Sequence, residues 1–298
     1  MKIDQIIKAG GSVTIARAPE GYDALVLADL VRAAGADPRL PGKARAFLHV
    51  ARDDRRLSAL SEAFGFFAPE IEIISFPAWD CLPYDRVSPR AEIVAQRVSA
   101  LSRLREISGQ DGPPVVFLTT MNAALQRMPP AEMIENTAWS TAPGQVVDIE
   151  NLQSFLAQNG FSRSGTVVDP GDYAIRGGIV DIYAPGTDEP VRLDFFGDTL
   201  ESIRSFDAET QRTTKQLQGL QLLPAGELLL TPDAIATFRT GYAKRFGGVT
   251  STDPLYEAIS AGRRYDGMEH WLPLFHEKLA SLFDYAEWLA ISFDNAFE

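Results

Sequence analysis

Strand-like and helix-like segments alternate along the first 120 residues, and this alternation constrains the fold more than any other feature. Short β-branched or apolar runs are separated by stretches whose apolar residues recur at helical spacing. The expected strands are residues 12–16, 46–50, 71–76 and 115–120, and the expected helices are residues 23–32, 53–64 and 92–106. Strands separated by helices form parallel β-α-β units with right-handed crossovers. This part is therefore predicted to be a doubly wound α/β half-sheet, with Ser88 as the cap of the last helix.

The pattern changes after the turn signals Pro129-Pro130 and Pro143-Gly144. A short helix is expected at 149–159, followed by strands at 166–168, 178–183, 191–196 and 200–207 that are joined by Gly and Pro turns. This region is predicted to be a small, mostly antiparallel α+β unit. One more strand-like run begins at Leu220, and helical patterns lie near 232–246, 254–262 and 270–283.

The net charge of −12 is unevenly distributed along the 298 residues. Residues 121–230 carry 7 basic and 15 acidic side chains, whereas residues 1–120 carry 15 of each. Nucleic-acid affinity comes largely from Lys and Arg on phosphates, so the acidic middle favours a basic protein surface as its partner. No run of eighteen apolar residues predicts a membrane span, and the single Cys81 fits a reducing cytosol, so we expect a cytoplasmic protein without a membrane partner.

The first expected strand ends where a nucleotide-binding half-sheet carries its phosphate loop. A working loop needs small residues, a Lys for the phosphates and a Ser or Thr for Mg²⁺. The turn here is Arg17, Ala18, Pro19, Glu20 and Gly21. Proline removes a backbone donor, the glutamate repels phosphate, and neither Lys nor Ser/Thr follows the glycine. We therefore interpret the segment as a degenerate phosphate loop that serves as a structural turn.

Metal and thiol chemistry are not favoured by the sequence. His270 and His276 are six residues apart, which is not the spacing that places two imidazoles on one helical face, and His49 lies inside an apolar strand. Cys81 has no His or Lys close in sequence to lower its pKa, so we expect it to be inert.

Two pairs of acidic residues are candidates for acid/base machinery, namely Asp194 with Asp198 and Asp181 with Asp188. Both pairs flank Gly or Pro turns, where carboxylates commonly cap hairpins. The structural role is the favoured interpretation, and no catalytic residues are predicted.

The stretch after Gly171 is the most informative for binding. Strand alternation places Tyr173 and Ile175 on one face and Ala174 and Arg176 on the other. Arg163 is expected at the other end of a hairpin with this strand. Arginine is enriched among interface hot spots because its planar fork of donors fits carboxylates. The alternative is a solvated hairpin with one structural salt bridge.

Several long segments resemble the bacterial transcription-repair coupling factors. These segments are FPAWDCLPYD (76–85) with Ser88-Pro89 and Arg97, GDYAIRGGIVDIY (171–183), RLDFFGD (192–198), FDAETQRT (206–213) and GMEHWLPLF (267–275). The block at 171–183 is also similar to the excision-repair protein UvrB. The resemblance spans essentially the whole chain.

This resemblance implies a degenerate P-loop, RecA-like parallel sheet, as in domain 1 of UvrB, with an inserted small α+β antiparallel domain. Residues 1–125 would form domain 1a, residues 126–214 domain 2 and residues 215–298 domain 1b. The family proteins are longer and carry an RNA-polymerase-interaction domain, an ATP-driven DNA translocase and an autoinhibitory C-terminal domain. The chain is therefore expected to be no enzyme by itself and to use no cofactor, since ATP and Mg²⁺ belong to the translocase.

Domain 2 of the family docks on UvrA, the damage-recognition ATPase. Carried over to this sequence, the docking residues are Arg163 and Arg176, with Tyr173 and Tyr183 as flanking contacts, while Ala174 stands where UvrB has another arginine. RNA polymerase, double-stranded DNA and an intramolecular contact with the C-terminal domain are partners implied for the whole protein. Two alternatives stay open: duplex DNA binding by domain 1 arginines (Arg52, Arg55, Arg56 or those in 86–105), and residual ATPase activity.

Overall fold

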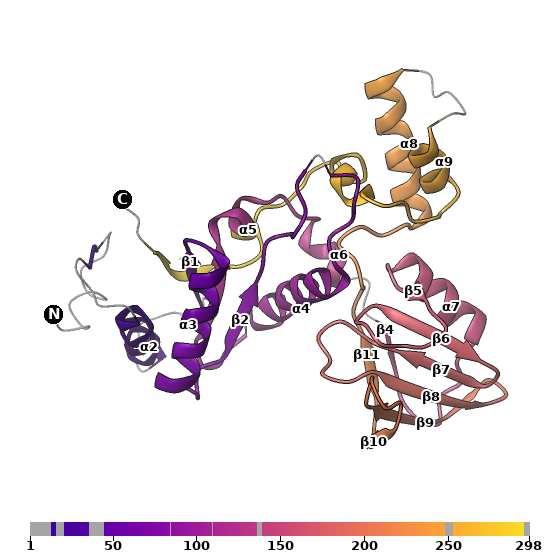
Figure 1. The fold of residues 1–298 in the computed structure, drawn as a ribbon, viewed down its shortest axis with the longest axis horizontal. Coiled ribbons are helices and arrows are strands. Elements are labelled where there is room, and N and C mark those ends of the chain that lie inside the picture. The colour runs from indigo at the N-terminus through magenta and orange to yellow at the C-terminus, as the bar shows by residue number, and fades with distance from the viewer. Residues whose placement is uncertain are drawn as a thin grey trace. The chain divides into compact units, whose positions relative to one another are not determined.

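The computed structural model describes residues 13–15, 21–35, 45–83, 85–108, 110–135, 139–247 and 253–294 (Figure 1). The chain divides into two compact units. The first draws on Met1–Ala78, Arg103–Gln126 and Ser281–Glu298, and the second on Trp79–Ser102 and Arg127–Ala280. None of the described helices is long and apolar enough to cross a bilayer.

A four-stranded, wholly parallel sheet forms the centre of the first unit. Its strands lie in the order β12 (Trp288–Phe293), β1 (Ala46–Ala51), β3 (Val115–Thr120) and β2 (Ile73–Phe76). Every residue of β1 and β3 is buried. Parallel strands that are covered on both faces have continuous apolar sequences, and β1 and β3 both show this pattern. The predicted parallel α/β sheet is confirmed.

The helices of the first unit begin where the sequence supplies caps. Helix α3 (Asp54–Phe67) starts after Asp53, whose carboxylate accepts the backbone N–H of Arg56. Helix α2 (Tyr22–Gly35) and the short α5 (Met121–Leu125) complete the described helices that lie wholly in this unit, besides the short 3₁₀ helix η2 (Leu282–Asp284). Small and aliphatic side chains of α2 and α3 pack with β1 and β3 in one apolar core. The helices predicted from the sequence at these places are confirmed.

The division between the units falls within helix α4 (Ala91–Ile107). Ser88 was expected to cap this helix, and that prediction is wrong. The helix starts three residues later, and the Ser88 hydroxyl instead donates to Glu269 Oε2 at 2.6 Å and accepts from the Gly267 N–H.

The second unit contains a six-stranded sheet. The strand order is β10 (Thr213–Leu217), β9 (Thr199–Phe206), β8 (Val191–Phe196), β7 (Ile179–Ile182), β6 (Asp172–Arg176) and β5 (Ser162–Arg163). All neighbours pair antiparallel except β5 with β6. One face packs on helix α7 (Ile149–Gln158), which Asp148 caps. The mixed α/β class with a mostly antiparallel second sheet therefore agrees with the sequence.

The remaining elements of the second unit are short. Strands β4 (Trp139–Thr141) and β11 (Leu220–Leu222) form a two-stranded ladder, and helix α6 (Ala131–Glu135) precedes β4. Helices α8 (Pro232–Phe246) and α9 (Pro254–Ser260) pack with the 3₁₀ helix η1 (Met268–Leu274) around Phe238.

A buried ion pair anchors the segment around Trp79 in the second unit. Arg97 and Glu227 are 0% and 1% exposed, and Arg97 Nε lies 2.5 Å from Glu227 Oε1. The same carboxylate oxygen accepts the indole N–H of Trp79 at 3.0 Å. The described residues around Trp79 form no helix, and this contact fixes the segment in place.

Several predicted elements differ from the structure. Of the expected first strand, only Val13–Ile15 is described; these residues are exposed and lie in no strand. Residues 166–168 form no strand, and residues 270–283 form no α-helix. Strands β4, β5, β10 and β12 were not predicted. The domain limits at 125 and 214 stay predictions, whereas the compact units break at 78, 102, 126 and 280.

Candidate functional site

The edge of the six-stranded sheet at β5 and β6 carries the two arginines selected from the sequence. Arg163 lies in register with Tyr173, and β5 covers only the first two residues of β6. The outer edge of β6 from Ala174 to Arg176 therefore has no neighbouring strand among the described residues. The two strands run parallel, so the predicted hairpin between Arg163 and this strand is wrong.

The side-chain alternation along β6 is confirmed. Tyr173 and Ile175 pack into the core beneath α7, whereas Ala174 packs in a small cluster on the opposite face. Tyr173 is only 3% exposed, and burial raises its pKa while nearby Arg163 lowers it. Tyr173 is thus a core residue whose ring is not open to a partner.

Arg176 projects from the other face and shares a buried carboxylate with a second arginine. Asp181 on β7 is 0% exposed and forms ion pairs with both Arg176 and Arg192. Arg192 donates from Nε at 2.6 Å and from Nη2 at 2.9 Å, and its guanidinium lies 4.7 Å from the Phe206 ring centre. Half of the Arg176 side chain is exposed. Asp181 therefore holds this guanidinium in place while part of it faces solvent.

Arg163 differs from Arg176 in having no ion-pair or hydrogen-bond partner for its side chain among the described residues. It is exposed beside the open strand edge. A guanidinium without an internal carboxylate is available to a carboxylate of another molecule.

Tyr183, the other aromatic residue selected from the sequence, is half-buried. Its ring packs against Val167, Ala174 and Phe206, and its hydroxyl donates to the Asp188 carbonyl at 3.1 Å. Burial raises its pKa, with smaller contributions from Asp188 and other acids. Part of the ring remains exposed on the face of the sheet that carries Arg176.

One member of each acidic pair, Asp194 and Asp181, has structural partners, whereas Asp198 and Asp188 are exposed. Asp194 accepts hydrogen bonds from the Ser202 hydroxyl at 2.7 Å and from Arg204 Nε at 3.0 Å. Asp181 is occupied by its two arginines, as described above. Both carboxylates are therefore engaged by side chains of the sheet, and the absence of a catalytic role stays a prediction.

The histidines and the cysteine form no metal centre among the described residues. The fold does bring His270 near Cys81, with Nε2 3.8 Å from Sγ, a contact that sequence spacing could not show. Burial, reinforced by Asp80 and Glu269, nevertheless raises the pKa of the Cys81 thiol. The thiol is therefore kept protonated, and no nucleophile results.

Residues Arg17, Ala18, Pro19 and Glu20 of the degenerate phosphate loop lie outside the described residues. Gly21 is described, with a φ of +83°, and helix α2 begins directly after it. A left-handed φ favours glycine, which agrees with the structural turn expected at this position.

Most arginines considered for DNA binding are already paired with carboxylates. These pairs are Arg52 with Asp53, Arg56 with Asp23 and Asp294, Arg90 with Asp80, Arg97 with Glu227, and Arg103 with Glu72 and Glu106. Arg55 and Arg86 have no such partner among the described residues. Because paired guanidinium groups neutralise fewer phosphates, the geometry gives the DNA alternative little support.

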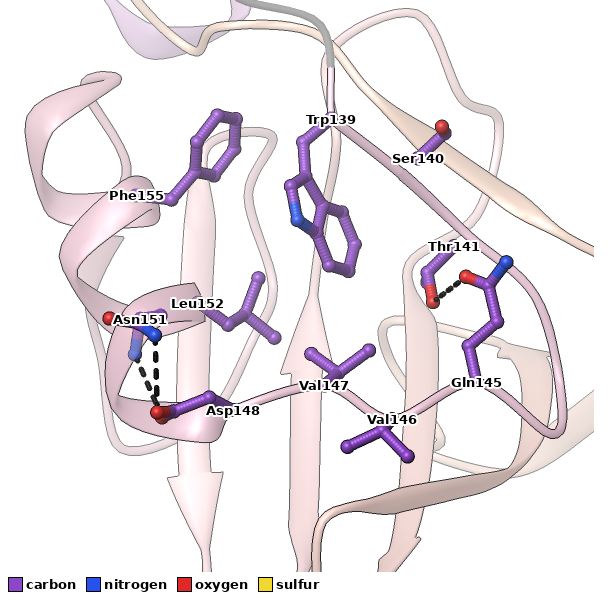
Figure 2. Close-up of a pocket in the computed structure, with 10 residues that line it drawn as sticks. All are labelled: Trp139, Ser140, Thr141, Gln145, Val146, Val147, Asp148, Asn151, Leu152 and Phe155. Atoms are coloured by element: carbon purple, nitrogen blue, oxygen red, sulfur yellow. Dashed lines mark hydrogen bonds between the residues drawn. The ribbon is translucent and has the colours of Figure 1, made fainter.

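A cavity of about 390 Å³ lies beside the start of α7, and neither Arg163 nor Arg176 lines it (Figure 2). Its wall residues come from β4, the following loop and α7: Trp139, Ser140, Thr141, Gln145, Val146, Val147, Asp148, Asn151, Leu152 and Phe155. Its one carboxylate, Asp148, accepts two backbone N–H groups of α7 and the Asn151 amide. Its lining mixes apolar and polar side chains, and its carboxylate is already hydrogen-bonded.

Comparison with known proteins identifies the region that carries these arginines. The family model of the UvrB interaction domain matches residues 140–228, which include the whole six-stranded sheet. The chain is 34% identical over 249 residues to the transcription-repair-coupling factor of Rickettsia bellii, 34% over 238 residues to that of Haemophilus influenzae and 32% over 237 residues to that of Escherichia coli. The chain is homologous to part of the transcription-repair-coupling factors. These matches cover 79–84% of this chain but only 20–22% of the relatives' length.

Proposed function

We propose that this chain is a docking part of a transcription-repair coupling factor, and that its UvrB interaction domain binds the excision-repair protein UvrA. In the whole protein this contact would bring UvrA to stalled RNA polymerase, while duplex DNA and ATP would be handled by other domains. The chain itself would carry out no catalysis.

The observation that carries the proposal is the pair of arginines at the open edge of β6. Arg163 has no internal partner among the described residues, and Arg176 is held by buried Asp181 with half of its side chain exposed. Both lie in the matched interaction domain. A guanidinium group held on a rigid strand can donate two parallel hydrogen bonds to a carboxylate of a protein partner.

Charge supports a protein partner over nucleic acid for this domain. Residues 140–228 carry six basic and thirteen acidic side chains, so the domain as a whole repels phosphate. The two arginines are a local exception at one sheet edge. An acidic domain is attracted to a partner whose surface is basic overall. A few acidic side chains on that partner could then bind the two arginines.

Binding of purified UvrA to the immobilised chain tests the proposal. We expect Arg176→Ala to weaken binding by about 1–3 kcal/mol, the usual loss for one charge-assisted interface contact. Arg212→Ala is the matched control, because Arg212 is an exposed arginine near β10 at the opposite edge of the same sheet. Equal affinities of the Arg176 variant and the wild type, with both folded, would sink the assignment.

A further inference from the structure

An exposed phenyl ring lies on the same face of the six-stranded sheet as Arg176. Phe196, the last residue of β8, is 78% exposed. The preceding Phe195 packs against the core beneath α7, and side chains alternate along a strand, so Phe196 points to the opposite face. Arg176 points to that opposite face too, because its neighbour Ile175 packs beneath α7.

Strand pairing places two further apolar side chains on this face. Ile179 on β7, 36% exposed, is in register with Arg176 on β6 and with the residue of β8 that lies two positions before Phe196. Val146, 76% exposed, is bridged to Thr199, which is itself in register with Phe196. Residues in register point to the same face of a sheet. Phe196, Ile179 and Val146 therefore form one apolar patch, called here the Phe196 patch.

The Phe196 patch adjoins the arginine selected for docking. Arg176 and Phe196 are two strands apart and offset by two residues, so their Cα atoms lie roughly 12 Å from each other at ordinary strand spacings. A protein interface of ordinary size buries about 800 Å² on each partner, which is enough to cover both side chains. One partner surface can therefore contact the ring and the guanidinium together.

The packing of the domain does not account for the exposed ring. Phe196 belongs to neither of the two apolar clusters described for this sheet. The polar positions around it are occupied by ion pairs, in which Asp181 and Asp194 bind arginines of neighbouring strands. An exposed apolar patch with a charged rim is typical of interaction sites, and aromatic residues and arginine are enriched among interface hot spots.

We propose that the Phe196 patch is the apolar centre of the surface that binds UvrA, with Arg176 at its polar rim. This inference rests on the proposed function and adds the chemistry of the contact. The partner surface is apolar where it covers the phenyl ring, and beside that area it carries a carboxylate that accepts from Arg176. UvrA is chosen as the partner because the patch is continuous with Arg176 on one sheet face of the matched domain.

The affinity of purified UvrA for the 298-residue chain tests the inference. Phe196→Ala should raise the Kd about 10- to 100-fold, as for an aromatic residue at the centre of an interface, whereas Phe196→Leu should keep most of the affinity. Phe66→Ala is the matched control, because Phe66 on α3 of the first unit is 80% exposed, and its Kd should equal that of the wild type. Both rings are exposed, so the circular dichroism spectra should stay unchanged.

Salt separates the contribution of the ring from that of the arginine. Ions screen an exposed charge pair, whereas the burial of an apolar ring does not depend on charge. The loss of affinity caused by Phe196→Ala should therefore be the same at low and high salt. The loss caused by Arg176→Ala should become smaller as the salt concentration rises.

The outcomes distinguish this inference from the proposed function. Wild-type affinity in the folded Phe196→Ala variant, with weaker binding by Arg176→Ala, would overturn the inference and leave the proposed function standing. An equal loss in the Phe66 control would also overturn it, as would self-association of the wild type that Phe196→Ala abolishes without changing the affinity for UvrA. If the wild-type chain does not bind UvrA, the proposed function and this inference both fail.

Discussion

In the parallel-sheet unit, Arg56 lies between Asp23 and Asp294 with 15% of its side chain exposed. In the interaction domain, Arg176 shares buried Asp181 with another arginine and remains half exposed, while Arg163 has no internal partner among the described residues. The residue type is the same, but the number and burial of the surrounding carboxylates differ. We infer that the first arrangement neutralises the guanidinium within the unit and the second presents charge to another molecule.

The comparison shows that the role of an arginine depends on the carboxylates that surround its guanidinium group. The sequence placed Arg56 among the DNA-binding candidates on charge alone, and the structure shows that two carboxylates meet its charge. In the domain that the family model matches, the exposed Arg163 has no partner among the described residues, and the half-exposed Arg176 shares a carboxylate with a second arginine. Substitutions of these arginines or of their carboxylate partners test whether the two arrangements differ in role.

The largest effect is expected where an arginine is completely enclosed. Arg97→Ala would leave Glu227 as a buried, unpaired carboxylate and should lower the free energy of unfolding by about 3–5 kcal/mol. Urea denaturation followed by tryptophan fluorescence measures this, since Trp79 contacts the same carboxylate. Arg103→Ala, at a surface pair, should cost under about 1 kcal/mol, and similar losses for both would contradict the comparison.

The buried imidazole should make the first unit sensitive to acid. Burial lowers the pKa of His49 to about 4, against 6.5 in the unfolded chain, so its neutral form is favoured by folding. Stability is then complete above about pH 6.5 and decreases as the pH falls toward 4, by roughly 3 kcal/mol in total. His276, whose pKa is also lowered by burial, acts in the same direction.

The difference between the wild type and His49→Gln isolates the His49 contribution. Free energies of unfolding measured from pH 7 to pH 5 should change less steeply with pH in the variant, and the difference in slope should approach one bound proton near pH 5. Parallel slopes would show that His49 is not protonated on unfolding in this range.

A smaller effect is expected at the carboxylate that positions Arg176. Asp181→Asn removes the shared negative charge, but both arginines can regain water, so the free energy of unfolding should fall by only about 1–3 kcal/mol. The same substitution should weaken UvrA binding, because the Arg176 guanidinium loses its fixed position. Asp194→Asn, which affects the partly exposed Arg204 pair on the same sheet, should leave UvrA affinity unchanged.

Local patterns predicted much of the fold. The apolar runs of β1 and β3 and the alternation along β6 follow from nearest-neighbour chemistry, and each is confirmed. Strand β12 was missed because its pairing with β1 joins segments about 240 residues apart, and β10 was missed because its polar residues show no alternation. Pro273 lies inside a 3₁₀ helix, which explains why the helical pattern beyond residue 270 failed.

The candidate site was predictable in part. Resemblance selected Arg163 and Arg176, and alternation gave the face of Arg176. The parallel pairing of β5 and the role of Asp181 were missed, although the spacing of alternate residues already placed Asp181 and Arg192 on the same face as Arg176. The Arg56 cluster depends on three segments separated by up to 271 residues, so local patterns could not reveal it.

The affinity of UvrA for the wild-type chain and for the Arg163→Ala/Arg176→Ala double variant tests the central claim most directly. The account predicts that the double variant, with its circular dichroism spectrum unchanged, binds UvrA more weakly than either single variant, while Arg212→Ala binds as the wild type does. Wild-type affinity in the double variant, or an equal loss in the Arg212 variant, would contradict it.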